Sequence, residues 1–540
     1  MAARRGATSR LDPPAFEPRI GSGASWHDAL TLAAAACLLA LVAVWNGHPF
    51  MYPDTPTYLR GAEMGVTKIV GEGQLPPWIP AGTQSEPAAG TAPSSETSGS
   101  ITSVEDKIVL AGRSVYYGAL LYLSFLAGSL WLAVLAQGLC VAYVLHLLVV
   151  RIWGLRKSTF LAGVAVLAAV TPLAVFTGLL MPDIFAGLTI LCIALLGVYW
   201  RQLDRTHRWL LAALLLFSLA SHSSHVAIAA ALLLLGLALR GWSRWRSLSL
   251  RGMGVVAACV VGALVAEAAF NKAVTLAVGA PPLRLPHLTA RLVDMGPGTD
   301  YLRRHCASTR YAACAFLENY PTPWDEFLFS TDPGKGAFAL ADPAAKRRLS
   351  EEQLPLALGV LKHDPAGVLS GIAADIVRQV GLFQVDVAGL PPRHVLPAYA
   401  GRVPEAVFTG LQRSRTMHSN AAYNYFNALT YGTVGASLLL AGILAWRLRR
   451  ADEGAPALAS PPGFNDFAAV VLAGVIANAV VCAALAGALE RFQSRVIWLV
   501  PFLALAWIAL ALHRRRAGVS IDPANPNATT SIPSYERPTP

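Results

Sequence analysis

The sequence predicts an all-α integral membrane protein with about ten transmembrane helices, interfacial helices in the first external loop, and a mostly helical external loop domain after helix seven. Two observations carry this prediction. The chain has 540 residues, of which 54% are hydrophobic and only 14% charged, a balance typical of membrane proteins. Apolar runs of about 20 residues, long enough to cross a bilayer as helices, then recur along the chain.

The predicted spans are the longest apolar runs between polar connections. They lie at about 28–46, 126–150, 158–177, 184–200, 207–221, 224–240, 252–276, 427–446, 466–487 and 495–512. The fifth and sixth are short and are separated only by the polar sequence SHSSH. The first run continues without an A-x-A-like cleavage site, so we expect it to stay in the protein as the first membrane helix.

Positive charges in the short connections predict the orientation. Basic clusters fall on one side of the membrane if the ten spans are right, and they include Arg4 with Arg5, Arg156 with Lys157, Arg244 with Arg246, and Arg514 with Arg515. Lys and Arg collect on the cytoplasmic side, so we expect both termini in the cytoplasm. The membrane is expected to be a bacterial plasma membrane. The formal charge of +11 then reflects topology, and no nucleic-acid partner is expected.

These spans divide the chain into five parts. We expect a cytoplasmic tail at 1–27, a transmembrane module of seven helices at 28–278, an extracytoplasmic loop domain at 279–425, transmembrane helices at 426–513, and a disordered cytoplasmic tail at 514–540. Within the first external loop, the small and polar residues 81–100 are typical of a disordered linker.

An apolar aromatic stretch follows this linker. Together with the second span it is too long for one helix, so we expect residues 113–125 to form an interfacial helix. Tyr116, Tyr117 and Tyr122 would then lie at the level of the lipid headgroups.

The external loop domain has local signals of its own. Helices are predicted at 343–363 and 365–381, the second with Asp364 as N-cap and Pro365 at its first position. Of seven cysteines, only Cys306 and Cys314 lie in a polar region. In an extracytoplasmic loop they are expected to form a disulfide, the alternative being two unpaired thiols.

Two aspartates interrupt the apolar pattern on the predicted external side. Asp54 follows the first span in the sequence FMYPDTPTYLRGA, and Asp183 stands between the third and fourth spans in LLMPDIFAG. Either could simply cap the helix that follows it. Acids at a membrane edge are costly, however, and usually face a cavity, which makes a functional role the competing hypothesis.

Cations accompany these acids on the same predicted side. His222 and His225 are three residues apart and could share one helix face and bind a phosphate or a metal, or form an ordinary polar turn. Arg491 and Arg495 are four residues apart and could clamp one anionic group, or anchor lipid headgroups. No internal repeat, phosphate-binding Walker loop, zinc motif or dinucleotide fingerprint accompanies them.

In this layout the chain resembles the GT-C superfamily of polytopic glycosyltransferases, which take sugars from polyprenyl-phosphate donors. The resemblance rests on an acid just after the first span, Asp54, a second acid in the next external loop, Asp183, interfacial helices in loop one, and a large external loop after the seventh span. It covers about residues 28–425 in topology, and its literal motif is two aspartates.

The resemblance implies a polyprenyl-phosphate-linked sugar as donor and a lipid or glycan as acceptor, beside the membrane lipids themselves. Asp54 would act as general base on an acceptor hydroxyl, and Asp183 would orient the acceptor. A divalent metal cation held by these two residues is the one cofactor that it leaves open. Arg491, Arg495, His222 and His225 would stabilise the charge on the departing phosphate.

Other classes of protein predict different features. A secondary transporter would have inverted repeats and buried charges at the membrane midplane, whereas the charges of this chain lie at one membrane edge. An O-antigen-type polymerase or ligase would also use lipid-linked sugars at the outer face but would make Asp54 dispensable. A purely structural membrane protein would tolerate substitution at all of these positions.

Overall fold

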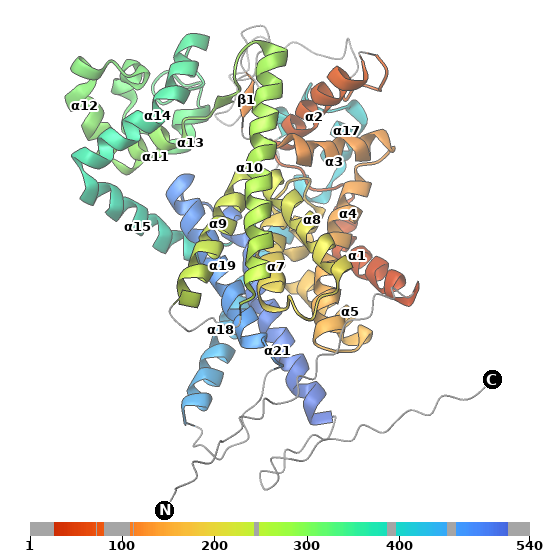
Figure 1. The fold of residues 1–540 in the computed structure, drawn as a ribbon. Helices are drawn as coiled ribbons and strands as arrows, with labels where there is room; N and C mark the ends of the chain where they lie inside the picture. Colours follow the sequence, from red (N-terminus) through yellow and green to blue (C-terminus); the bar gives the residue numbers. More distant parts are fainter. Residues whose placement is uncertain are drawn as a thin grey trace, which may run out of the picture.

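The computed structural model describes residues 26–71, 73–79, 109–111, 113–241, 248–385, 396–450 and 461–516 (Figure 1). The linker predicted at 81–100 lies outside these described residues, as do residues 1–25 and 517–540 of the tails predicted at 1–27 and 514–540. Within them the secondary structure is almost wholly helical, and the strands form one parallel pair, β1 (Leu110–Ala111) with β2 (Leu283–Arg284). The chain is thus an all-α membrane protein.

In chain order the helices are α1 (Trp26–Asn46), α2 (Thr55–Val70), α3 (Val115–Leu126), α4 (Trp131–His146), the π-helix η2 (Leu147–Ile152), α5 (Lys157–Val170), α6 (Leu173–Gly178), α7 (Ile184–Val198), α8 (Arg205–Ser221), α9 (Ser223–Gly241), α10 (Leu250–Val278), α11 (His287–Met295), α12 (Pro297–Thr309), the 3-10 helix η3 (Ala312–Asn319), α13 (Trp324–Phe329), α14 (Pro343–His363), α15 (Pro365–Gly381), the 3-10 helix η4 (Leu396–Ala398), α17 (Glu405–Arg413), the 3-10 helix η5 (Arg415–Met417), α18 (Ala421–Arg450), α19 (Phe464–Leu485), α20 (Glu490–Ile497) and α21 (Leu499–Arg516).

Seven helical stretches of the described chain are long and apolar enough to cross a membrane. They are Trp26–Asn46, Trp131–Ile152, Ser223–Gly241, Leu250–Val278, Ala421–Leu444, Phe464–Leu485 and Glu490–His513. The other three predicted spans coincide with the shorter helices α5 with α6, α7, and α8, so the number ten stays a prediction.

The span predicted at 158–177 is not one helix. Its first part, α5, ends at Val170, and α6 begins at Leu173 after the sequence Thr171–Pro172. Thr171 has extended backbone angles, φ −134° and ψ 167°, because the ring of a following proline clashes with a helical residue before it. The break brings an irregular segment, 179–183, to the end of the bundle where α1 ends and α7 begins, called the site end below.

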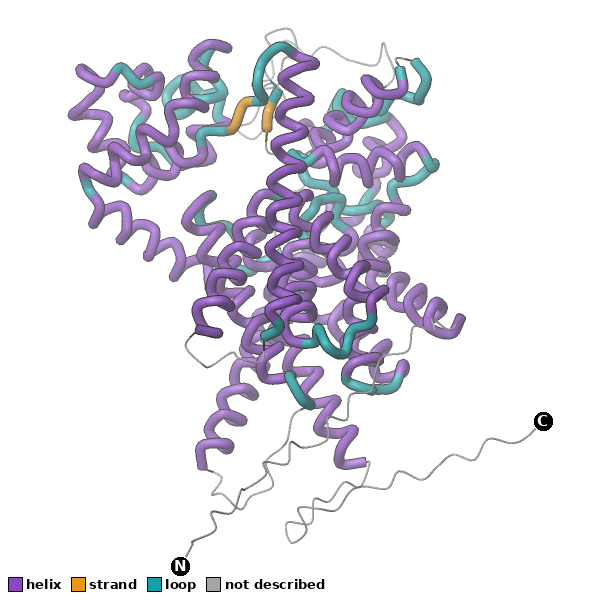
Figure 2. The backbone as a smooth tube through the Cα atoms, viewed as in Figure 1, coloured by secondary structure: helices purple, strands orange, loops and turns teal. Residues whose placement is uncertain are grey.

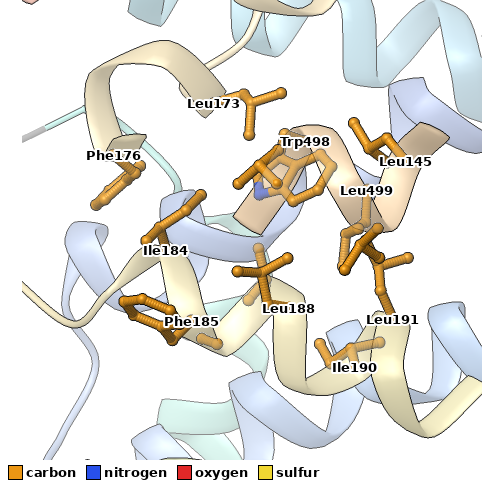
Figure 3. Packing of buried hydrophobic residues seen from close by; sticks show 14 of the residues in the cluster. Leu145, Leu173, Phe176, Ile184, Phe185, Leu188, Ile190, Leu191, Trp498 and Leu499 are labelled. Atoms are coloured by element: carbon orange, nitrogen blue, oxygen red, sulfur yellow. The ribbon is translucent and has the colours of Figure 1, made fainter. Parts of the chain in front are cut away.

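Helix α7 is the centre of the main core. Every residue from Ile184 to Gly197 is buried, so this helix contacts protein on all sides. Its 15 residues rise only about 22 Å, which is short for a membrane span. Trp498 packs where α7 has no side chain, since a Cβ on Gly187 would come within 2.9 Å of its ring (Figure 3).

Loop one contains two helices, α2 and α3. Helix α3 corresponds to the interfacial helix predicted at 113–125, and the Ser114 hydroxyl accepts hydrogen bonds from the backbone N–H groups of Tyr116 and Tyr117 at its start. The prediction that Tyr116, Tyr117 and Tyr122 lie at headgroup level stays a prediction, but Tyr117 and Tyr122 do not face lipid. Both are fully buried, with their hydroxyls donating to Gln137 and to the Pro76 carbonyl, so they belong to the protein core.

Residues 283–368 form a second unit with its own hydrophobic core, the loop domain. It lies beside the site end of α10, and the short strands lie between them (Figure 2). Helices α14 and α15 match their predicted ranges, and the Asp364 carboxylate accepts from the Gly367 N–H at 2.8 Å as the predicted cap. The predicted disulfide between Cys306 and Cys314 is confirmed.

The later part of the predicted loop domain packs elsewhere. Tyr399, Val403 and Leu411 belong to the main core and not to the core of the loop domain. Asn46 at the end of α1 accepts hydrogen bonds from the backbone N–H and the hydroxyl of Thr416, at 3.0 and 2.9 Å. Residues 396–417 therefore cover the site end of α1 and α2.

A close helix contact gives a test of this packing. A Cβ on Gly252 of α10 would lie 1.9 Å from the carbonyl oxygen of Leu196 in α7, whereas a Cβ on Gly254 would meet nothing within 4 Å. We expect Gly252→Ala to destabilise the protein by about 1–3 kcal/mol or more, because backbone must move. Gly254→Ala is the matched control and should raise helix stability by up to about 1 kcal/mol.

Thermal unfolding of both variants in the same detergent measures the difference. Equal midpoints for the two variants would contradict the close packing of α7 against α10.

Candidate functional site

The loops that carry Asp54 and Asp183 meet at the site end. Phe50 and Leu179 form a parallel bridge, in which the Phe50 N–H donates to the Gly178 carbonyl at 2.9 Å and the Leu180 N–H donates to the Phe50 carbonyl at 2.8 Å. Each aspartate follows its bridge residue by four positions. The two predicted site residues thus belong to one cluster, although their positions in the sequence are far apart.

Buried side chains satisfy the remaining backbone groups of this junction. Gln137 of α4 is fully buried and donates to the carbonyls of Thr177 and Leu179, at 2.8 and 3.1 Å. Its own amide oxygen accepts from the Tyr117 hydroxyl at 3.0 Å. The Thr55 hydroxyl donates to the Leu180 carbonyl at 3.0 Å. Irregular backbone at membrane depth is stable only when its polar groups are satisfied by protein in this way.

Asp54 stands at the N-cap position of α2, but its carboxylate does not cap the helix. It accepts instead from the guanidinium of Arg113, at 2.7 Å, and 13% of its side chain is exposed. The capping alternative is therefore wrong for this side chain. Arg113, two residues before the start of α3, was missed because nothing local in the sequence connects it to Asp54.

Asp183 also stands at an N-cap position without capping its helix, α7. Its carboxylate is buried, and one oxygen lies 3.4 Å from Nε of Arg491 and 3.7 Å from Nη1 of Arg495. The two arginines thus point the same way, as their spacing predicted, and the anionic group between them is a side chain of the protein. The guanidinium of Arg491 also stacks over the ring of Tyr52, 4.1 Å from its centre.

Tyr58 of α2 is close enough to Asp54, Asp183, Arg113 and Arg491 to be influenced by the charge of each. Burial raises the pKa of Tyr58, Arg113 and Arg491 oppose this rise, and Asp54 and Asp183 add to it. One buried phenol thus experiences both acids and two of the arginines, which places these groups around a common centre.

The cluster has more positive than negative charge. Arg402 donates to the Thr57 hydroxyl at 3.0 Å, and burial lowers the pKa of Arg402 while Asp54 opposes this change. Arg402 therefore adds to Arg113, Arg491 and Arg495, against the carboxylates of Asp54 and Asp183. In addition, Nη1 of Arg491 is buried without a hydrogen-bond partner. Buried cations in excess favour an anionic ligand.

The two histidines do not share a helix face. His222 has an extended backbone, φ −160°, at the end of α8, and only His225 lies in the first turn of α9. The ring nitrogen Nδ1 of His225 contacts the Ser218 carbonyl at 2.7 Å, and its Nε2 is buried without a partner. The chain leaves the helical conformation at His222 itself, although the two imidazole rings still lie with their centres 5.4 Å apart.

The histidine turn is nevertheless part of the cluster. Ser224 donates its backbone N–H to Nδ1 of His222 at 3.2 Å, and its hydroxyl accepts from Arg495 at 3.1 Å. His222 also interacts electrostatically with the positive charges of Arg495, Arg113 and Arg491. The structure therefore brings together all six predicted site residues, the histidines through Ser224.

The loop domain adds a residue that the sequence did not indicate, His287. It begins α11, its side chain is half-buried, and its Nδ1 atom is buried without a hydrogen-bond partner. Burial and, to a smaller extent, the charge of Arg113 lower the pKa of His287 to about 4, against the opposing effect of Asp54. His287 is thus a neutral imidazole at neutral pH beside the Asp54–Arg113 pair.

Helix α20, which carries Arg491 and Arg495, is held in place by α15. The side chain of Gln379 donates to the Leu489 carbonyl at 2.8 Å and accepts from the Leu489 N–H at 2.9 Å. Leu489 is the residue just before α20. The Arg291 guanidinium of α11 pairs in turn with Asp375 of α15. The loop domain is therefore connected through α15 to the helix that carries Arg491 and Arg495.

The arrangement does not suit the divalent metal that the resemblance left open. Among the described residues, no group of three or more His, Cys, Asp or Glu side chains converges. Asp54 and Asp183 each pair with arginine, so their charge is already compensated. A hard divalent cation needs several oxygen ligands, and we derive no chemical step through a metal.

Comparisons of the chain with protein-family models, with curated proteins and with solved structures gave no match.

The difference in burial between the two aspartates gives a test. We expect Asp183→Asn to lower the free energy of unfolding by about 3–5 kcal/mol, because it leaves two buried guanidiniums without a counter-charge. Asp54→Asn removes a partly exposed ion pair and should cost about 1 kcal/mol or less. Thermal unfolding in one detergent compares the two variants, and an equal loss for both would contradict the buried Asp183 triad.

The burial of His287 predicts a pH dependence. Between pH 6.5 and about 4, the unfolded chain binds a proton at His287 that the folded chain does not bind. Stability therefore falls as pH falls through this window, and at pH 5 this residue accounts for a loss of about 2 kcal/mol. His287→Gln should make the thermal midpoint less sensitive to a change from pH 7 to pH 5. Unchanged sensitivity would place the imidazole in solvent.

Proposed function

We propose that this chain is a membrane glycosyltransferase that moves a sugar from a polyprenyl-phosphate-linked donor to a hydroxyl of a lipid or cell-envelope glycan, at the extracytoplasmic face of a bacterial plasma membrane. The observation that carries the proposal is the cluster at the site end. There the carboxylate of Asp54, 13% exposed, lies in a cluster with more arginines than acids, of which Arg495 is buried and Arg113 and Arg491 are half-buried. A base next to an anion site is what this reaction requires.

Asp54 is the candidate base. One of its oxygens accepts from Arg113, and 13% of its side chain is exposed, more than the 2% of Asp183. An acceptor hydroxyl would attack the anomeric carbon of the donor sugar and give its proton to Asp54. The bond from that carbon to the phosphate oxygen breaks, and its electron pair leaves with the phosphate.

The arginines are the candidate site for the departing phosphate. Arg491 has a buried nitrogen, Nη1, without a hydrogen-bond partner, which a phosphate oxygen would satisfy. Fixed cations stabilise a transition state most where negative charge develops. Arg495 is almost fully buried and bonds to Asn478 and Ser224, so it supports Arg491 and the histidine turn.

The geometry favours a positioning role for Asp183 over direct contact with the acceptor. Its side chain is only 2% exposed, and both nearby cations point at one of its oxygens. It would hold Arg491 and Arg495 at the phosphate site. His287, neutral and close to Asp54, is a further candidate for contact with the acceptor hydroxyl.

A polymerase or ligase of the O-antigen type is the second candidate function. It is favoured by the number of arginines and by the pairing of both acids with them. A carboxylate that is paired with a guanidinium is a weaker base, because its charged form is stabilised. In that reaction Arg491 would be essential and Asp54 would not.

One experiment separates these functions. Cell-surface glycans and lipid-linked sugars are compared in cells that make the wild type, Asp54→Asn, Arg491→Gln or the exposed control Asp300→Asn at matched protein levels. We expect Asp54→Asn to reduce transfer by about 10²–10⁴-fold, the range for a lost general base, and lipid-linked sugar to accumulate.

The remaining outcomes are equally informative. Loss of transfer in Arg491→Gln with normal transfer in Asp54→Asn would favour the polymerase or ligase. Normal glycans and normal lipid-linked sugars in both variants would overturn the proposed function.

A further inference from the structure

Helix α15 has its polarity reversed relative to a helix at a protein–water boundary. Asp375 and Gln379 are buried against the protein, whereas Leu369, Val377 and Val380 are 61%, 76% and 50% exposed. A helix in water buries its apolar side and exposes its polar side. The exposed residues are spaced by eight and three positions, so they lie on one side of the helix.

The buried polar groups of α15 are satisfied by protein. Asp375 pairs with Arg291 of α11, and Gln379 exchanges two hydrogen bonds with the backbone of Leu489. Asp375 and Gln379 therefore have hydrogen-bond partners without any contribution from water. Arg378 is the one charged residue next to the apolar row, and it lies 3.4 Å from Asp375 with most of its side chain exposed. A long arginine side chain can extend from such a position to the headgroups.

The end of α15 lies beside the first turns of a membrane-spanning helix. The Tyr431 hydroxyl donates to the Gly381 carbonyl at 3.0 Å, and the rings of Phe383 and Tyr431 stack with centres 4.2 Å apart. Tyr431 is ten residues into α18 and four residues into the span predicted at 427–446. Four helical residues rise about 6 Å, so the end of α15 lies in the outer part of the hydrocarbon.

Helix α15 also packs along α19, a second candidate span, whose residues Leu472 and Ile476 are 40% and 59% exposed. Figure 1 shows α15 descending from the loop domain to the level of α9 and α19. Its exposed apolar row is therefore continuous with the lipid-facing surface of the bundle.

We propose that α15 dips into the extracytoplasmic leaflet and anchors the loop domain in it, with the row Leu369, Val377 and Val380 in contact with lipid. The occupant of this surface is the bilayer, because the row continues the apolar belt and reaches hydrocarbon depth. This inference concerns the surface of the protein and is independent of the proposed glycosyl transfer.

Spin labels on the full-length protein in phospholipid vesicles test the proposal. Cys37→Ser first removes the exposed free thiol of the described chain, and single cysteines then replace Leu369, Val377 or Val380. Oxygen concentrates in hydrocarbon and a nickel chelate concentrates in water, so the ratio of their collision rates reports depth. We expect this ratio to increase from position 369 to 377 and 380.

Two control positions set the scale. Ile476→Cys on α19 should show the high ratio of a lipid-facing site, and Lys335→Cys should show the low ratio of a water-facing site, because Lys335 forms an exposed ion pair with Glu326. A low ratio at 377 and 380, equal to that at 335, would overturn the proposal. Protection of 377 and 380 from both reagents would also overturn it and would indicate a protein partner, such as a second copy.

Discussion

The backbone pairing of Phe50 with Gly178, Leu179 and Leu180 is the interaction on which the rest of the site depends. Two irregular segments meet there at the edge of a membrane protein, where backbone groups without partners are expensive. Backbone groups of each segment form hydrogen bonds with the other, and the Gln137 side chain donates to the carbonyls of Thr177 and Leu179. The pairing fixes Asp54 relative to Asp183, and every ion pair of the cluster is built on that arrangement.

Most charged groups of the cluster have a partner of opposite charge, but one arginine nitrogen has no hydrogen-bond partner. Asp183 lies between two guanidiniums, and Arg495 has further acceptors in Asn478 and Ser224. Arg491 has Asp183 and the face of Tyr52, but its Nη1 has no partner. Because Arg491 keeps Asp183 as its counter-charge, its one unpartnered nitrogen is not an uncompensated buried charge. The fold thus tolerates a local excess of positive charge at the place where we propose that a phosphate binds.

Local signals in the sequence predicted local features well. The Asp364 cap, the boundaries of α14 and α15, and the Cys306–Cys314 disulfide depend on residues close together in the chain. The break before Pro172 was also readable, because proline restricts the preceding residue, but the apolar run concealed it. Tyr117 and Tyr122 could not be assigned from composition, since aromatic residues serve the membrane belt and the core equally well.

Long-range pairing was outside the reach of the sequence. Topology placed Asp54, Asp183 and the cations on one side, yet it could not select Arg113 or His287 as neighbours of Asp54, because neither has a distinctive sequence context. The side chains of both aspartates also turned away from the caps that their positions suggested. A partner that offers full charge outweighs a backbone N–H, and only the folded chain shows where that partner lies.

The two hydrogen bonds between Gln379 and Leu489 have a consequence for motion. They fix the axial position of α20 against α15, so neither helix can slide along the other without breaking both. The loop domain, α15 and the start of α20 are therefore joined, so that a tilt of the loop domain would carry the backbone of Arg491 with it.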